Sequence, residues 1–235
     1  GPTEYPSKVG KERKMRHGLS IAGAVCALGL LVPANAAEIT IVELGPDDFE
    51  FGDYAATGLQ TYELWLTGLT EGDVLLSLFG DSMSPMTLMT TAVDGFYNAD
   101  ELGQTHFAGN PALFETFPTL QWDTFFAIGD DADASVSPGF PDTALFGGGS
   151  SIMENDNLAW FDGDPTTPAM SSGGQIFIGQ FSMAMDADFG GMLSAQIRNE
   201  AGEEIRYRDL EFFIPAPGAL ALLGLAGLAG RRRRR

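Results

Sequence analysis

Carboxylates are the side chains best able to do chemistry in this chain, and five of them stand in two short clusters. The first cluster contains Asp130, Asp131 and Asp133, and the second contains Asp162 and Asp164 on either side of a glycine. Oxygen ligands at alternating positions with a glycine suit Ca²⁺, which takes about 6–8 oxygens. Neither cluster continues into the glutamate-terminated loop of an EF-hand. The two alternatives are therefore a structural Ca²⁺ site and solvated turns.

Side chains for nucleophilic or metal-assisted catalysis are scarce. His106 is the one histidine between Ala37 and Phe213, and that range has no cysteine. A serine–histidine–aspartate arrangement would depend on His106 alone, and zinc sites need cysteine or several histidines. The sequence also has no phosphate-binding loop and no dinucleotide fingerprint. We predict a protein that is not an enzyme and has no cofactor, with structural Ca²⁺ as the alternative. The alternative is a glycoside-acting enzyme, which requires only a pair of carboxylates.

Two tryptophans are candidates for ligand binding. Trp65 lies in phase with Glu63 on its predicted strand and out of phase with Leu64, so its ring is expected on the outer face. Trp160 leads directly into the acidic cluster at Asp162. Exposed tryptophans of this kind stack on sugar rings in carbohydrate-binding modules, which is the binding alternative. The competing interpretation places both rings in the core.

The elements that must position these side chains are strands, because apolar residues alternate with polar ones almost throughout the chain. Turn signals rich in glycine and aspartate separate the alternating stretches. The predicted strands are Ile39–Leu44, a strand around Tyr62, Leu64 and Leu66, Val74–Phe79, Trp122–Ile128, Ile176–Met185, Gly191–Asn199 and Glu204–Phe213. The last two should form a hairpin around Ala201-Gly202.

Seven or more strands with no convincing helical period predict an all-β fold, an antiparallel β-sandwich of the jelly-roll or Greek-key kind. Two long regions, residues 81–118 and 130–174, are rich in glycine, proline and aspartate, and we expect them to be long loops. Loops of this length are uncommon unless they carry function, so a binding site is expected there first.

The charge of residues 37–213 is strongly negative. Three basic residues, Arg198, Arg206 and Arg208, stand against thirty acidic ones, so the net charge is near −27. Such a surface repels nucleic acid and anionic lipid, and both are excluded as partners. The same range is long enough for one domain with its own core.

The N-terminal region has the pattern of a secretory signal. Basic residues from Lys11 to Arg16 precede the apolar run Leu19–Val32, and Ala34-Asn35-Ala36 provides the small residues of a cleavage point. Met15 is a natural initiator. We therefore expect a leader over residues 1–14 that is not part of the native mature sequence, a signal helix within residues 15–36 and an exported domain over residues 37–213.

The C-terminal 22 residues have three parts. The first part is Pro215, Ala216 and Pro217, which break regular secondary structure. An apolar stretch of alanine, leucine and glycine spans 218–230, and a basic cluster that includes Arg231, Arg232 and Arg233 follows it. The stretch would be about 20 Å long as a helix, short of a hydrocarbon core of about 30 Å. The arginines would hold its end on the cytoplasmic side.

This tail, residues 214–235, resembles the PEP-CTERM sorting domain of exported bacterial proteins, with Ala216 at the position of the motif's glutamate. The resemblance implies processing by an exosortase-type enzyme, transient contact with the inner membrane through 218–230, and a final place at the cell surface or in the extracellular matrix. A permanent C-terminal anchor is the alternative.

Residues 37–213 also resemble exported bacterial β-proteins that bear such tails, through the stretches 61–66, 117–129 and 174–182, but this resemblance implies no activity. We therefore expect an exported, non-catalytic surface or matrix protein, whose partners include extracellular polysaccharide if the carbohydrate-binding alternative holds.

Overall fold

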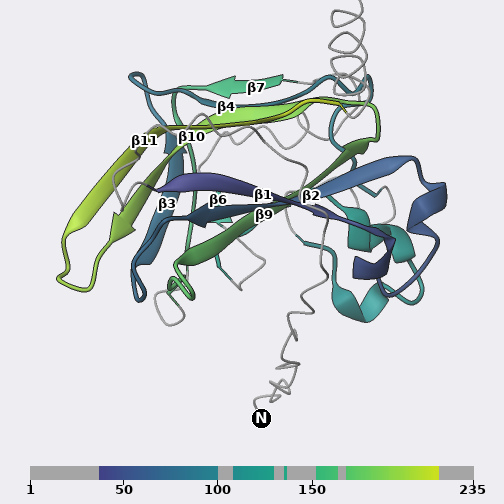
Figure 1. Ribbon diagram of the computed structural model, residues 1–235, viewed down its shortest axis with the longest axis horizontal. Coiled ribbons are helices and arrows are strands. Elements are labelled where there is room, and N and C mark those ends of the chain that lie inside the picture. The colour runs from purple at the N-terminus through teal and green to yellow at the C-terminus, as the bar shows by residue number, and fades with distance from the viewer. Residues whose placement is uncertain (1–36, 100–107, 130–134, 137–151, 164–167, 217–235) are drawn as a thin grey trace, which may run out of the picture. The chain divides into compact units, whose positions relative to one another are not determined.

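The computed structural model describes residues 37–99, 108–129, 135–136, 152–163 and 168–216, and it is built almost entirely of antiparallel strands (Figure 1). Two sheets share one hydrophobic core. The described residues contain no α-helix, only short 3-10 helices, as the period-two pattern predicts. The expected signal helix and C-terminal helix lie outside the described residues.

The first sheet, called sheet A, has four antiparallel strands. In spatial order they are β1 (Glu38–Leu44), β2 (Leu59–Thr67), β9 (Gln175–Ala184) and β5 (Phe125–Phe126). Strands β2 and β9 form the centre of this sheet, and β2 alternates buried Leu64 and Leu66 with half-exposed Glu63 and Trp65.

The second sheet, called sheet B, has seven strands. They are β6 (Ser135–Val136), β8 (Leu158–Phe161), β3 (Val74–Gly80), β10 (Phe189–Arg198), β4 (Met86–Thr90), β7 (Ile152–Asn155) and β11 (Glu204–Ile214). Strand β11 pairs along one edge of β10, while β3 and β4 pair with successive halves of its other edge. Strands β3 and β4 therefore lie end to end along β10, separated by residues 81–85.

The 3-10 helices gather in the segments between strands, and three of them begin at a proline whose missing N–H is not needed there. They are η1 (Pro46–Asp48), η2 (Tyr54–Ala56), η4 (Pro111–Leu113) and η5 (Pro118–Trp122).

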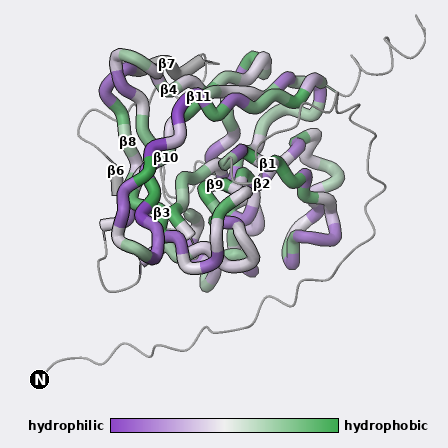
Figure 2. Tube along the Cα trace, turned by 60° about the vertical axis from the view of Figure 1, so that its left-hand side comes forward, coloured by the Kyte–Doolittle hydropathy of each residue, from purple (hydrophilic) through white to green (hydrophobic). Residues whose placement is uncertain are grey.

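The core lies where the two sheets face each other, and aromatic rings join them. The ring of Phe189 in sheet B lies 5.8 Å from Tyr62 and 5.3 Å from Phe181 in sheet A, measured between centroids. Trp160 of sheet B lies 4.6 Å from Phe126 of sheet A. Hydrophobic stretches accordingly run through strands of both sheets (Figure 2). Burial of this apolar surface is the main favourable contribution to folding.

Several predicted strands are confirmed. The first strand is present as β1, and the hairpin around Ala201-Gly202 is β10 and β11. Its turn closes with the N–H of Asn199 donating to Glu203 O at 3.0 Å, and Gly202 adopts a φ of 80° that favours glycine.

Other predictions were wrong in detail. The stretch Trp122–Ile128 contains only the two-residue strand β5, because Pro118 starts a 3-10 helix that runs to Trp122. The regions 81–118 and 130–174 hold strands as well as loops, namely β4 in the first and β6, β7 and β8 in the second. These strands are two to five residues long and pair with distant segments, so local periodicity does not reveal them.

Candidate functional site

The outer face of sheet A carries a row of three aromatic rings, and Trp65 stands at one end of it. Trp65 lies directly opposite Phe177 in the register of β2 and β9, with their ring centroids 5.3 Å apart. Phe125 of β5 follows at 6.0 Å from Phe177. All three side chains are partly exposed. The outward orientation of Trp65 is therefore confirmed, and we call Trp65, Phe177 and Phe125 the aromatic row.

A β-bulge in β9 brings Phe177 opposite Trp65. The register shifts between Leu64 and Trp65, so that Gly179 faces Leu64 and Phe177 faces Trp65. Gly179 has a φ of 152°, and a Cβ there would lie 2.7 Å from Phe125 O. Glycine is thus required for β5 to approach β9 closely enough to complete the row.

The rings of the row are tilted rather than coplanar. The Trp65 and Phe177 planes meet at 53°, and those of Phe125 and Phe177 at 67°. The indole N–H of Trp65 donates to Glu63 Oε2 at 3.1 Å, which fixes the ring and places a carboxylate beside it. This arrangement can offer apolar faces to a ligand and a polar group at their edge.

The other half of the same face is covered by the segments that contain the 3-10 helices. The Tyr54 hydroxyl donates to Thr61 Oγ1 at 2.9 Å, and the Thr61 and Ser182 hydroxyls lie 2.7 Å apart. Burial raises the pKa of Tyr54, partly opposed by the hydrogen bond to Thr61. The amide of Gln180 donates to Gln121 O and Asp123 O. These buried bonds hold the covering segments in place and leave the aromatic row at the open end.

Trp160, the second predicted ligand-binding residue, lies in the core and not on the surface. Its side chain is 0 % exposed and its indole N–H donates to Ala127 O at 3.2 Å, so it is a core residue that cannot stack on a ligand. Strand β8 turns it inward, and the neighbouring Phe161 is the exposed ring, at 37 %.

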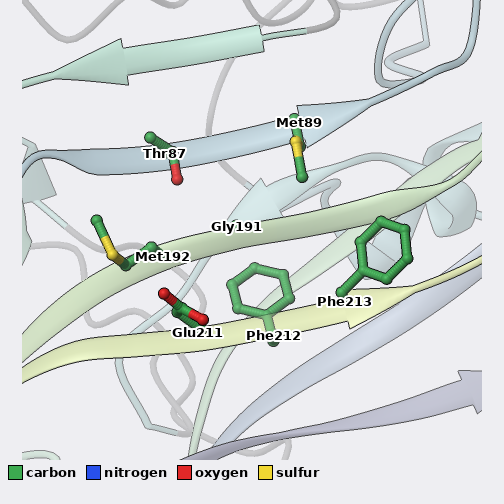
Figure 3. Close-up of a pocket in the computed structure, with 7 residues that line it drawn as sticks. All are labelled: Thr87, Met89, Gly191, Met192, Glu211, Phe212 and Phe213. Carbon is green, nitrogen blue, oxygen red and sulfur yellow. The ribbon is translucent and has the colours of Figure 1, made fainter.

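A second feature is a shallow hollow of about 580 Å³ on sheet B (Figure 3). It lies across β4, β10 and β11, and its apolar walls are Met89, Met192 and Phe213, with Thr87 and Glu211 as polar neighbours. Phe213 is 57 % exposed and Met89 is 40 % exposed. We call this the methionine–phenylalanine hollow. Sequence analysis missed it, although Phe213 stands at an outward position of β11 between Phe212 and Ile214.

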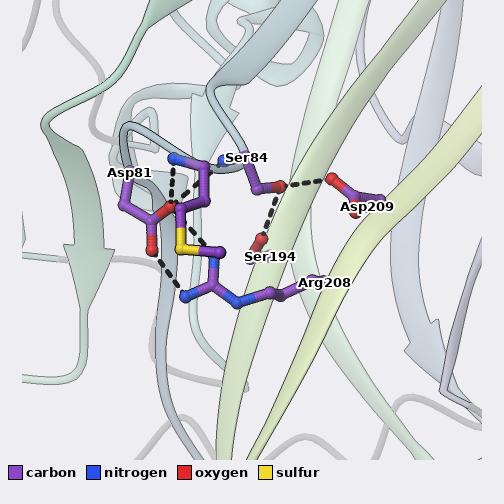
Figure 4. A network of polar contacts seen from close by, with 6 residues as sticks. Asp81, Ser84, Ser194, Arg208 and Asp209 are labelled. Atoms are coloured by element: carbon purple, nitrogen blue, oxygen red, sulfur yellow. Dashed lines mark hydrogen bonds and ion pairs between the residues drawn. The ribbon is translucent and has the colours of Figure 1, made fainter.

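A third feature is a polar network on sheet B, in the segment 81–85 between β3 and β4 and the neighbouring parts of β10 and β11 (Figure 4). The Ser84 hydroxyl donates to Asp209 Oδ1 at 2.6 Å and lies 3.1 Å from the Ser194 hydroxyl. Opposite Ser194, β11 bulges by one residue at Arg208 and Asp209, and Asp209 has a φ of 54°. Aspartate is among the few residues that tolerate this conformation.

An ion pair closes the network toward solvent. Arg208 donates to both carboxylate oxygens of Asp81, at 2.9 and 2.7 Å. These hydrogen bonds, supported by the backbone N–H groups of Met83 and Ser84, hold the pKa of Asp81 well below its ordinary range. The same contact raises the pKa of Arg208. Ser84 and Ser194 are buried, and these hydrogen bonds join β10 and β11 to the segment between β3 and β4.

Acid should weaken this ion pair. A carboxylate with a lowered pKa in the folded protein contributes stability above its unfolded pKa, near 3.8, which is lost as pH falls through the folded value. We therefore expect the melting temperature of the wild type to exceed that of Asp81→Asn at about pH 6, and the difference to shrink below about pH 4. Thermal melts across this range would test it, with Asp186→Asn as the control. A difference independent of pH would contradict the role of the ion pair.

The acidic clusters are mostly beyond what the structure describes. Asp130, Asp131, Asp133 and Asp164 lie outside the described residues, while Asp162 accepts the N–H of Ala169 at 3.2 Å. No group of three or more potential metal ligands occurs among the described residues. Calcium binding at these clusters stays a prediction.

The tail is described only at its start. Ala216 donates its N–H to Asp188 Oδ1 at 2.6 Å, and Pro215 precedes it. Pro217, Arg231, Arg232 and Arg233 lie outside the described residues. Within the described part of the chain, no helix has the length and apolar character that a membrane span needs.

Comparison of the chain with family models, curated proteins and solved structures gives no match.

Proposed function

We propose that this chain is an exported, non-catalytic protein of the cell surface or extracellular matrix that binds a neutral polysaccharide on the aromatic row. The observation that carries the binding proposal is the contact of Trp65, Phe177 and Phe125 on the outer face of one sheet. Aromatic faces supply rigid apolar area, which the C–H faces of sugar rings match, and polar groups at the edge orient the ligand.

The charge of the domain selects among polysaccharides. With three basic and thirty acidic residues between Ala37 and Phe213, the surface repels anionic chains. The tilt between the rings also disfavours a flat crystalline ligand, because no single plane contacts all three. A single, soluble, neutral chain that twists along the row is the ligand class that fits both observations.

Affinity electrophoresis tests this proposal directly. The full chain should be retarded in gels that contain a soluble neutral glucan such as hydroxyethyl cellulose, or a soluble galactomannan, and should migrate unchanged in gels with alginate. Retardation by alginate alone, or by none of these polymers, would overturn the binding proposal.

Export and sorting are proposed on the residues at the two ends of the chain. Cleavage after Ala36, transient insertion of 218–230 in the inner membrane and processing near Pro215-Ala216-Pro217 by an exosortase-type enzyme account for those residues together. We infer that the two sheets form a β-sandwich of the jelly-roll or Greek-key kind, which is a stable scaffold for exposure outside the cell without disulfides.

Intact mass of the native protein tests the sorting proposal. In fractionated cultures we expect the protein in the medium or matrix with a mass that begins near Ala37 and ends between Pro215 and Gly218. A membrane-bound protein that retains Arg231–Arg235 would instead identify a permanent anchor.

A further inference from the structure

The methionine–phenylalanine hollow is an apolar surface that the proposed polysaccharide site does not use. It lies on sheet B, whereas the aromatic row lies on sheet A. Gly191 of β10 lines the hollow together with its methionine and phenylalanine side chains, and Gly190 precedes Gly191 in the strand. A Cβ on Gly190 would lie 2.8 Å from the Phe213 ring, and one on Gly191 would collide with Thr87 O. These glycines therefore allow close approach of the strands beside the hollow.

The chain leaves the described domain beside this hollow. Phe213, one wall of the hollow, is four residues before Pro217, the first residue of the undescribed tail. The hydrogen bond from Ala216 to Asp188 holds the departing chain next to the first residue of β10. At about 3.3 Å per residue, the chain starts its tail within roughly 10–15 Å of the hollow. Tethering at this distance gives a high effective concentration.

We propose that the apolar segment Ala219–Ala229 of the same chain docks in the methionine–phenylalanine hollow before the tail is taken up by a membrane. Pro217-Gly218 is a turn-forming pair that would allow the chain to reverse over sheet B. The segment contains only alanine, leucine and glycine, so it can lie close to the exposed backbone at Gly191. Flexible methionines adapt to such a partner.

Charge also favours the segment Ala219–Ala229 as the occupant of the methionine–phenylalanine hollow. Glu211 lines the hollow, Asp188 holds Ala216, and the domain as a whole is strongly acidic. The arginines 231–235 that follow the segment are therefore attracted to this domain. Docking would shield an aggregation-prone segment during export. The segment would leave the hollow when a membrane offers it a more extensive apolar environment. This inference is independent of polysaccharide binding.

Disulfide trapping can locate the segment, because Cys26 is the only cysteine of the chain. The full chain would carry Cys26→Ser, Met192→Cys and Leu223→Cys, and would be oxidised with copper phenanthroline in dilute, detergent-free solution. The control replaces Met192→Cys by Thr40→Cys, an exposed position on sheet A. We expect intramolecular disulfide, seen as a mass loss of two hydrogens, to form about 10-fold or more faster than in the control.

Two outcomes would overturn the inference. Equal rates in both variants would show that the segment does not prefer the hollow. A disulfide between two molecules would assign the hollow to a second copy of the chain. Met89→Cys paired with Leu223→Cys gives an independent measurement if the Met192 variant folds poorly.

Discussion

Phe189→Ala should destabilise the domain by about 3–5 kcal/mol, the range found when a buried phenylalanine is truncated. Phe189 is 0 % exposed and its ring contacts four others. Those rings belong to Tyr62, Phe96, Phe181 and Phe212, with centroids 5.3–5.8 Å away. The alanine leaves a cavity between the sheets and removes these ring contacts, each worth about 0.5–1.5 kcal/mol beyond burial. Urea unfolding followed by circular dichroism would measure the loss.

The matched control is Phe213→Ala, which removes the same ring from an exposed position. Because Phe213 is 57 % exposed, its truncation should change the free energy of unfolding by no more than about 0.5 kcal/mol. If Phe189→Ala and Phe213→Ala cost the same, the two sheets do not share the core described here.

Trp65→Ala should weaken polysaccharide binding by about 10-fold or more while the fold is retained. Trp65 is the largest ring of the row and faces Phe177 across β2 and β9, and anchors of this kind dominate binding energy, at about 2 kcal/mol or more each. The indole is partly exposed on the outer face, so the core loses little when it is removed. Isothermal titration calorimetry with the soluble neutral glucan would give the affinities of both proteins.

Two further variants separate a binding role from a structural one. Trp65→Phe keeps an aromatic face and should retain part of the affinity that Trp65→Ala loses. Phe161→Ala removes an exposed ring on sheet B and should leave the affinity for the glucan unchanged. Unaltered affinity of Trp65→Ala, with a melting temperature like that of the wild type, would remove the aromatic row from the site.

The candidate site could be predicted only in part. The period-two pattern predicts that Trp65 points outward, because alternation along a single strand needs no knowledge of its neighbours. Its partners could not be found this way. Phe177 stands between Ile176 and Ile178, where no apolar–polar alternation shows which side chain points outward, and the bulge at Gly179 decides which residue faces Trp65. Trp160 was misplaced because its strand is four residues long and its orientation depends on pairing with β3.

By itself, the sequence determined the class of fold, the hairpin around Ala201-Gly202 and the acidic character of the domain, since these follow from local alternation, turn residues and composition. Only the tertiary structure decided which surfaces exist. The aromatic row takes its rings from β2, β5 and β9, and the methionine–phenylalanine hollow takes its walls from β4, β10 and β11. These residues lie as much as 124 positions apart, as Met89 and Phe213 do, and long-range strand pairing alone brings them together.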